Sequence, residues 1–367
     1  MASGLPVYWD YLGLDRLLSL QGGLEGDDEA VSPDELHFIV VHQVFELWFK
    51  LVLRELRMAR DQLACPRVPE EAVPLVVHHL RRTNEIFRLA IEQFRIMETL
   101  TPQDFLAFRD KLVPASGFQS FQMRELEILL GLDDGDRAAE LGVAPLDAIR
   151  QLADQSPAGA YAWSRIEAAR GEETLRAALH TWLYRTPIQG SSPGDSGDAE
   201  AVQGFVEAYL AALASHQAGQ EERLVAIPGA NPEATRARLA QNLAMARGFL
   251  SADDAAEPGR ARVQRVRAGL LFVESYRQLP LLAWPRTLID TVVELEENLV
   301  LLRSRHARMV ERIIGRRIGT GGSSGVDYLD QTTRYRVFHE LWTVRTLLLP
   351  RDRVPPLAHP ERYGFAT

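Results

Sequence analysis

Apolar residues recur at helical spacing along most of the chain, and no stretch alternates apolar and polar residues between hairpin turns as strands would. The longest helical patterns cover residues 33–63 and 288–314. The first opens on the sequence SPDE, in which Ser32 suits the cap, the proline suits the first helical position and Glu35 completes a capping box. The pattern therefore predicts an all-α fold.

Prolines divide the rest of the pattern into shorter helices. The sequence TPQD, which starts at Thr101, repeats the capping chemistry ahead of a helix that Pro114 ends. Further on, a dense apolar helix is predicted over residues 263–315, with interruptions at Pro280 and Pro285. We expect separate helices on the two sides of each interruption.

One region lacks the apolar pattern. From Gln189 to Glu200 the sequence QGSSPGDSGDAE loses its apolar residues except Ala199, which is typical of a solvated loop or a disordered linker. Alanine-rich helical patches then alternate with breakers such as IPGANP and ADDAAEPG. We expect residues 189–260 to be an insertion with a flexible loop and peripheral helices, between the segments 1–188 and 261–367.

Composition narrows the class of protein. The chain has 367 residues, 46% hydrophobic and 25% charged, which is enough for one large or two ordinary soluble domains. The net charge of −9, with arginines interleaved among acids, argues against a nucleic-acid partner. Cys65 is the only cysteine, so an internal disulfide is impossible and a cytoplasmic location fits best. We find no signal peptide and no apolar run near the roughly 18 residues of a membrane span, and we expect no membrane partner.

Candidate chemistry begins with a histidine among aromatic residues. Phe38, His42, Phe45 and Phe49 follow one another at steps of four, three and four, which places them on one face of a helix. A core histidine satisfied by a neighbouring carbonyl would show the same pattern. Spacing alone therefore leaves the role of His42 open.

A second histidine, His306, interrupts an apolar stripe. The stripe consists of Leu299, Leu302, Met309, Val310 and Ile313. A neutral imidazole on an apolar helix is what haem iron needs as a proximal ligand. A buried histidine without a metal is the commoner origin of such a pattern, so this role also stays open.

The glycine-rich sequence RRIGTGGSSGVDY, residues 316–328, does not fit a phosphate site. A phosphate loop would need a lysine and would follow a strand, as a dinucleotide fingerprint would, whereas this loop follows a helix. Zinc-protease and serine-hydrolase motifs are also missing. Arg109, close to PASGFQS, offers a forked donor for a substrate carboxylate, although an ion pair with Asp110 or Glu98 would be its ordinary fate.

Several long motifs in order resemble the tryptophan 2,3-dioxygenase family. They are YWDYLGLD, HFIVVHQVFELWFKLVLREL, QFRIMETLTPQDFLAFRDKLVPASGFQSFQ, WLYRTP, RHARMVERIIGRRIGTGGSSGVDYL and RYRVFHELWTVRTLLLPR. The resemblance covers most of the chain outside the expected insertion. It implies an all-α haem-binding bundle, with haem b that is ferrous for activity, in a homotetramer. The implied reaction adds O2 across the indole 2,3 bond of L-tryptophan and gives N-formylkynurenine.

The resemblance also implies roles for single residues. His306 falls on the proximal haem ligand, and His42 on the distal histidine that faces the indole nitrogen. Arg109 falls on the arginine that binds the substrate carboxylate. Thr320 falls on the threonine near the substrate ammonium group, in a glycine-rich loop that would serve as a pliant lid. The remaining implied positions are Phe38, Phe108 and Ser116 in the pocket, and Tyr8 and Tyr11, a pair that in the family reaches into a neighbouring subunit's active site.

In terms of this resemblance, residues 1–188 hold the N-terminal arm and the distal-side helices of the haem domain. Residues 261–367 hold the proximal helix, the glycine-rich loop and the C-terminal helix of the same domain. The chain departs from the family at Trp9, where a glycine is usual, and beside the distal histidine at His37 and Val41. Two alternatives therefore stay open: a related haem monooxygenase acting on a substituted tryptophan in secondary metabolism, and a non-catalytic haem-binding sensor.

Overall fold

The computed structural model describes residues 7–115, 117–132, 145–320 and 325–364, and these residues form helices joined by loops. Within these ranges the one β feature is an isolated bridge between Ile188 and Ser191. The prediction of an all-α fold is confirmed. The helices are α1 (Tyr8–Leu12), α2 (Leu14–Leu17), α3 (Pro33–Ala64), α4 (Ala72–Met97), α5 (Pro102–Phe108), α6 (Phe121–Leu130), α8 (Pro145–Ala153), α9 (Pro157–Arg170), α10 (Leu175–Tyr184), α11 (Asp198–Val225), α12 (Pro232–Leu250), α13 (Arg260–Ser275), α14 (Ala283–Ile314), α15 (Val326–Thr332) and α16 (His339–Leu347). The 3-10 turns are η1 (Arg109–Leu112), η2 (Gly117–Gln119), η3 (Pro280–Leu282), η4 (Arg351–Arg353) and η5 (Pro360–Tyr363).

The predicted cap of the first long helix is confirmed in part. Helix α3 begins at Pro33, and the Ser32 hydroxyl accepts the backbone N–H of Glu35 at 3.2 Å. The prediction that Glu35 completes a capping box, by bonding the backbone N–H of Ser32 in return, is wrong. The Glu35 carboxylate accepts a bond from Lys111 at 2.9 Å instead. At α5 the cap is as predicted: the Thr101 hydroxyl accepts the N–H of Asp104 at 3.3 Å.

The two predicted proline interruptions differ in outcome. Pro280 opens the turn η3 and separates α13 from α14, as expected. Pro285 does not interrupt a helix, because α14 runs from Ala283 to Ile314 and the proline lies in its first turn. There the missing N–H costs nothing, since the first N–H groups of a helix have no acceptor.

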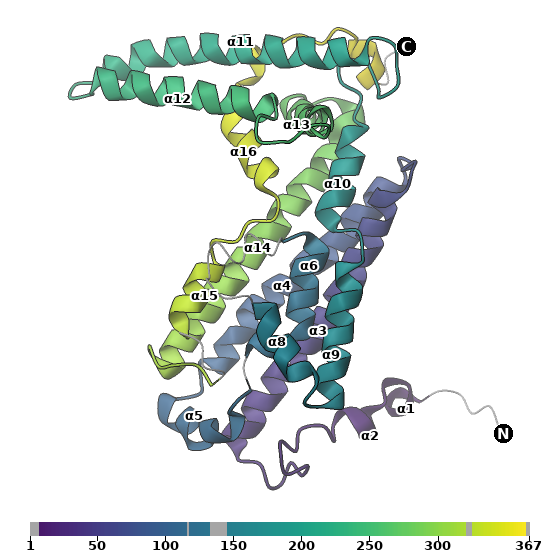
Figure 1. The fold of residues 1–367 in the computed structure, drawn as a ribbon, viewed down its shortest axis with the longest axis vertical. Helices are drawn as coiled ribbons and strands as arrows, with labels where there is room; N and C mark the ends of the chain where they lie inside the picture. The colour runs from purple at the N-terminus through teal and green to yellow at the C-terminus, as the bar shows by residue number, and fades with distance from the viewer. Residues whose placement is uncertain (1–6, 116, 133–144, 321–324, 365–367) are drawn as a thin grey trace, which may run out of the picture. The chain divides into compact units, whose positions relative to one another are not determined.

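The chain forms two compact units. Unit 1 comprises Met1–Leu56, Arg82–Glu172 and Leu295–Tyr335, so parts of the long helices α3, α4 and α14 belong to it. Phe45 of α3 packs on Phe94 of α4 with their ring centroids 4.9 Å apart. A smaller core joins α6, α8 and α9 (Figure 1). Its buried members are Leu146, Ile149 and Ile166, with Phe121, Ile128 and Trp163 packed against them.

Unit 2 comprises Arg57–Arg81, Glu173–Glu294 and Arg336–Thr367. Helices α11 and α12 run side by side as a hairpin within it (Figure 1). Phe272 of α13 contacts the rings of Phe205 and Tyr276 at 5.5 and 4.6 Å. Helices α10 and α13 pack closely at Gly269, where an added Cβ would lie 2.7 Å from the carbonyl oxygen of Leu183. This part of the structure therefore has an aromatic core of its own.

Residues 189–197 of this segment form a loop, which is anchored rather than a disordered linker, and helix α11 begins at Asp198. The backbone N–H of Gly190 donates to the Tyr363 hydroxyl at 2.7 Å. The Ser191 hydroxyl bonds Asp198 at 2.9 Å, and the buried Arg265 binds the same carboxylate. Composition shows that this loop cannot build a core, but it does not show which distant residues hold it.

Helix α3 also corrects the expectation that no apolar run approaches a membrane span. Its residues Pro33–Ala64 are long and apolar enough to cross a bilayer by length and composition. Scattered charges such as Glu46 and Lys50 interrupt the run without removing this property. Most of this apolar stretch is not buried inside the chain. The helix therefore carries apolar surface beyond its core-facing side.

Candidate active site

An aromatic cluster surrounds His42 where α3 meets α5. Phe38 lies one turn before His42, and the two ring centroids are 4.0 Å apart. Phe38 also contacts Phe105 and Phe108 of α5, at 6.0 and 5.6 Å. The predicted helix face of α3 and the short helix α5 thus supply one continuous aromatic wall, on which an aromatic substrate can pack.

The hydrogen bond of His42 fixes its tautomer. Its Nδ1 lies 2.7 Å from the carbonyl oxygen of Phe38. Because a carbonyl only accepts, Nδ1 carries the proton, and Nε2 of the neutral ring keeps a free lone pair. His42 is exposed as a residue, yet enough protein surrounds its ring for desolvation to lower the pKa of His42 below 6.5. At neutral pH His42 therefore presents an acceptor rather than a cation.

His306 lies on α14 with its ring stacked on Phe94 of α4. The centroids are 5.6 Å apart and the planes differ by 14°. Leu302 and Met309, at the adjacent turns of α14, are buried. Burial lowers the pKa of His306 to about 4, and the positive charge of Arg124, together with that of His42 when it is protonated, acts in the same direction. The ring is therefore neutral, and no hydrogen bond engages it within the described residues.

Arg109 and Thr320 join the end of α5 to the loop after α14. The Arg109 Nη2 donates to the carbonyl oxygen of Ile318 at 2.5 Å, and the Thr320 hydroxyl donates to the carbonyl oxygen of Ala115 at 2.5 Å. The Nε of Arg109 is buried and has no partner among the described residues. Glu98, one of the acids expected to neutralise Arg109, pairs with Arg305 at 2.8 Å instead. The guanidinium therefore retains a donor for an external anion.

Comparison with known proteins shows the family to which the chain belongs. The family model for tryptophan 2,3-dioxygenase matches residues 1–348. The chain belongs to the tryptophan 2,3-dioxygenase family. It is 48% identical over 367 residues to tryptophan 2,3-dioxygenase 2 of Ralstonia nicotianae, an alignment that covers 98% of this chain and 97% of the relative.

Two further relatives are also tryptophan 2,3-dioxygenases. The chain is 47% identical to the tryptophan 2,3-dioxygenase of Sorangium cellulosum, with 98% of this chain and 87% of the relative covered. It is 31% identical to that of Dictyostelium discoideum, with 98% and 88% covered. The chain is accordingly a tryptophan-oxidising dioxygenase of this family.

The structure brings most of the expected site residues of this dioxygenase together within unit 1. Phe38, His42 and Phe108 share the aromatic cluster, and Arg109 and Thr320 border it. Ser116 and the lid residues 321–324 lie outside the described residues. Tyr8 and Tyr11 lie on α1, which buries no residue, and their side chains are 71% and 81% exposed. The part expected of the tyrosine pair therefore stays a prediction.

Two aromatic residues of the site were not singled out from the sequence. Phe94 stacks on His306, and Phe105 packs on Phe38. Both lie in the motif QFRIMETLTPQDF, so the family motif contained the signal. Helical spacing could not find Phe94, because its partners lie on α3 and α14, far away in the sequence.

The family is haem-dependent, and the residues of this chain fit a haem. A proximal ligand must be a neutral imidazole with a free ring nitrogen, as His306 is. Apolar and aromatic walls suit the porphyrin faces, and Phe94 with the buried Leu302 and Met309 supply such a wall. His306 would therefore hold the iron.

Proposed function

We propose that this dioxygenase uses ferrous haem b, held by His306, to open the indole ring of L-tryptophan with O2 and form N-formylkynurenine. One observation carries the proposal. Two neutral histidines come from α3 and α14 within unit 1, and their ring nitrogens make different contacts. His306 has no partner for its ring, whereas the Nδ1 of His42 is held by a carbonyl. The first arrangement suits a metal ligand and the second a substrate contact.

Arg109 would bind the carboxylate of the substrate. Its Nη2 is steadied by the Ile318 carbonyl, and its buried Nε has no partner among the described residues. A guanidinium so placed can offer two parallel bonds to one carboxylate, which fixes both the position and the orientation of the amino acid. Because Phe108 precedes Arg109 directly, anchoring here places the indole beside the aromatic cluster.

Thr320 would receive the ammonium group of the substrate. Its hydroxyl proton is committed to the Ala115 carbonyl, so the oxygen has lone pairs left to accept from an N–H donor. Both polar ends of the amino acid would thus be held by groups at the end of α5 and in the loop after α14. The indole would be left to meet the aromatic wall.

His42 would accept the indole N–H through the free lone pair of Nε2. This contact sets the rotation of the indole about its long axis and thereby which ring carbons face the reaction centre. Haem, when bound, supplies the iron chemistry that activates dioxygen. The protein contributes binding, orientation and the aromatic wall of Phe38, Phe105 and Phe108.

The absorbance of the purified protein under reducing conditions, with and without L-tryptophan, tests this proposal. We expect a haem Soret band that shifts when tryptophan is added, followed by turnover once O2 is admitted. A Soret band that does not shift when tryptophan is added, together with no product after O2 is admitted, would favour the haem-sensor alternative. Absence of haem after reconstitution would contradict the role of His306. Attack on a substituted tryptophan alone, with one oxygen atom inserted, would favour the monooxygenase alternative.

We also propose that the protein is a homotetramer, in which Tyr8 and Tyr11 complete the active site of a neighbouring subunit. The support lies first in α1, whose aromatic side chains are exposed and bury nothing within their own chain. It lies also in a stripe on α3. Val40, Val44, Leu47 and Leu51 recur at intervals of four, three and four, which is the spacing that packs one helix against another.

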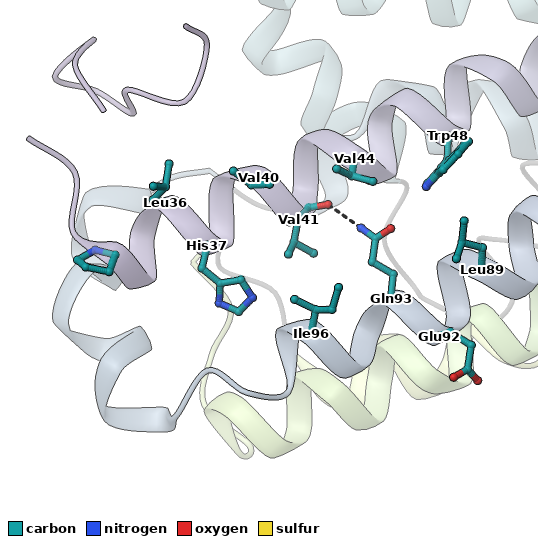
Figure 2. Close-up of a pocket in the computed structure, with 11 residues that line it drawn as sticks. Leu36, His37, Val40, Val41, Val44, Trp48, Leu89, Glu92, Gln93 and Ile96 are labelled. Carbon is teal, nitrogen blue, oxygen red and sulfur yellow. Dashed lines mark hydrogen bonds between the residues drawn. The ribbon is translucent and has the colours of Figure 1, made fainter. Parts of the chain in front are cut away.

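This stripe borders an apolar groove of about 730 Å³ between α3 and α4. Figure 2 shows Leu36, Val40 and Val44 along α3, with Ile96 and Leu89 along α4. Gln93 crosses the groove and donates to the carbonyl oxygen of Val41 at 3.0 Å. Val40 and Leu47 are 41% and 48% exposed.

The occupant that we propose for the groove is a second copy of the chain. The exposed rim of α4 carries both signs of charge, as in the pair between Arg95 and Glu92 at 3.1 Å, so two copies can complement each other. A net charge of −9 opposes docking on an anionic bilayer instead. We therefore place the protein in the cytoplasm as an assembly of its own copies.

A further inference from the structure

A buried cluster of charges connects α6 to α14 inside unit 1. Glu127 of α6 is 2% exposed and lies between two arginines. Its Oε2 is 2.9 Å from the Nη1 of Arg124, and its Oε1 accepts a bond from the Nη2 of Arg303 at 3.0 Å. Arg124 and Arg303 are 7% and 9% exposed. Each carboxylate oxygen therefore faces a different guanidinium in a region that excludes water.

The cluster has a surplus of one positive charge. Two guanidinium groups face one carboxylate, and an arginine stays protonated in proteins. The ring of Tyr335 lies 5.1 Å from the Arg303 guanidinium. Burial raises the pKa of Tyr335, so its phenol is neutral and its ring face attracts the cation without cancelling the charge. The Nε of Arg124 is buried and has no hydrogen-bond partner among the described residues.

The surplus charge lies beside the proposed iron ligand. Arg303 precedes His306 by three residues on α14, which places the two side chains on neighbouring turns of one helix. The charge of Arg124 is close enough to oppose a proton on the His306 ring. A fixed charge in a region of low dielectric constant acts over longer distances than one in water. The potential at the His306 imidazole is therefore shifted in the positive direction.

We infer that the cluster of Arg124, Glu127 and Arg303 raises the reduction potential of the iron held by His306 and so favours its ferrous state. The inference rests on the proposed role of His306 as haem ligand. When ferric iron takes up one electron from an external one-electron donor, the charge of the centre falls by one and no proton moves. A fixed positive charge nearby stabilises the state of lower charge. The three residues act through His306 and do not touch the substrate.

Two variants separate charge from packing. Arg124→Gln removes the surplus charge, because Glu127 and Arg303 then balance. The double variant Arg124→Gln/Glu127→Gln loses one charge of each sign, so Arg303 keeps the surplus although the ion-pair geometry is gone. We expect the midpoint potential of the ferric/ferrous couple, titrated with dithionite and mediators in the absence of substrate, to fall in the single variant. In the double variant we expect it to stay close to that of the unchanged protein.

Equal shifts in both variants would show that the cluster acts through packing, and unchanged potentials would show that it does not act on the iron; either result overturns the inference. Arg236→Gln, which removes a cation from the exposed surface of α12 in unit 2, serves as the matched control and should leave the potential unchanged. If Arg124→Gln does not retain haem, Arg303→Gln removes the same charge and should also lower the potential. Failure of the unchanged protein to bind haem would instead contradict the proposed function.

Discussion

His42 and His306 show that one type of side chain can have different chemistry when its neighbours differ. Both rings are neutral because desolvation lowers their pKa values. The Nδ1 of His42 is committed to a backbone carbonyl, so one nitrogen remains for an N–H donor. His306 stacks on Phe94 and keeps its ring nitrogens free of hydrogen bonds among the described residues. These differences, rather than residue type, suit one histidine to the substrate and the other to iron.

At this scale the first prediction concerns Arg109. Charge-assisted hydrogen bonds contribute about 1.5 to 3 kcal/mol, so Arg109→Leu should lower kcat/KM for L-tryptophan by at least roughly tenfold. Tryptamine lacks the carboxylate, so its kcat/KM should change much less. Arg109→Lys is the matched control, because it keeps the charge but loses the forked geometry. Its kcat/KM for L-tryptophan should lie between that of the unchanged protein and that of Arg109→Leu. Equal losses for tryptophan and tryptamine would exclude carboxylate binding by this residue.

The second prediction is a pH dependence of substrate binding through His42. The pKa of His42 lies below its ordinary value of 6.5, so the ring is neutral at pH 7 and gains a proton at Nε2 as the pH falls through that lowered pKa. The acceptor for the indole N–H is then lost. Tryptophan affinity, measured by haem absorbance, should be constant above pH 6.5 and decline only when the pH falls through the lowered pKa of His42. The affinity for 1-methyltryptophan, which has no N–H, should show no such decline; parallel curves for both ligands would disprove the contact.

At the scale of single elements, local signals were sufficient wherever the chemistry was local. The helix start at Pro33 and the caps by Ser32 and Thr101 depend on residues within three positions, and the structure confirms them. The predicted capping box is wrong at Glu35, because its carboxylate binds Lys111, which lies 76 residues further along the sequence. The segment 189–200 was expected to be a flexible loop or linker, but Tyr363 anchors it at Gly190, 173 residues away in the sequence. Composition does not encode such distant partners.

The third prediction concerns the apolar stripe on α3. Leu47→Glu places a charge in the middle of the stripe, at a position that is 48% exposed within its own chain. The fold should survive, because an exposed leucine contributes little to its own core. The assembly should dissociate towards smaller species, as measured by light scattering on a sizing column. Met245→Glu, on α12 and 53% exposed, is the matched control and should leave the assembly intact. An unchanged mass for Leu47→Glu would show that this stripe is not an interface.

At the scale of the whole molecule, the site residues that the structure describes belong to unit 1, although they come from segments far apart in the sequence. The family motifs contain most of the residues that we propose for the site. They could not show that Phe94 stacks on His306 or that Glu127 joins two arginines beside it, because these contacts depend on how α4, α6 and α14 pack. The boundaries of the expected insertion at residues 189–260 stay a prediction, although the hairpin of α11 and α12 falls within them.

The fourth prediction tests the haem ligand in the intact protein. His306→Ala should abolish stable haem binding, because the iron loses its protein ligand. Helical content, measured by circular dichroism, should be retained, since alanine has the highest helix propensity. His216→Ala, on α11 in unit 2, is the control and should bind haem normally. A full and unaltered Soret band in His306→Ala would exclude His306 as the ligand.

The most direct test of the central claim is mass spectrometry of the product formed from L-tryptophan under isotopically labelled dioxygen, with a β-substituted tryptophan offered in parallel. If Arg109, Thr320 and His42 hold tryptophan with its 2,3 bond facing the iron at His306, both atoms of one dioxygen molecule enter the product and the ring opens. We predict N-formylkynurenine carrying two labelled oxygen atoms. A product with an intact indole ring and a single labelled oxygen atom would contradict this account.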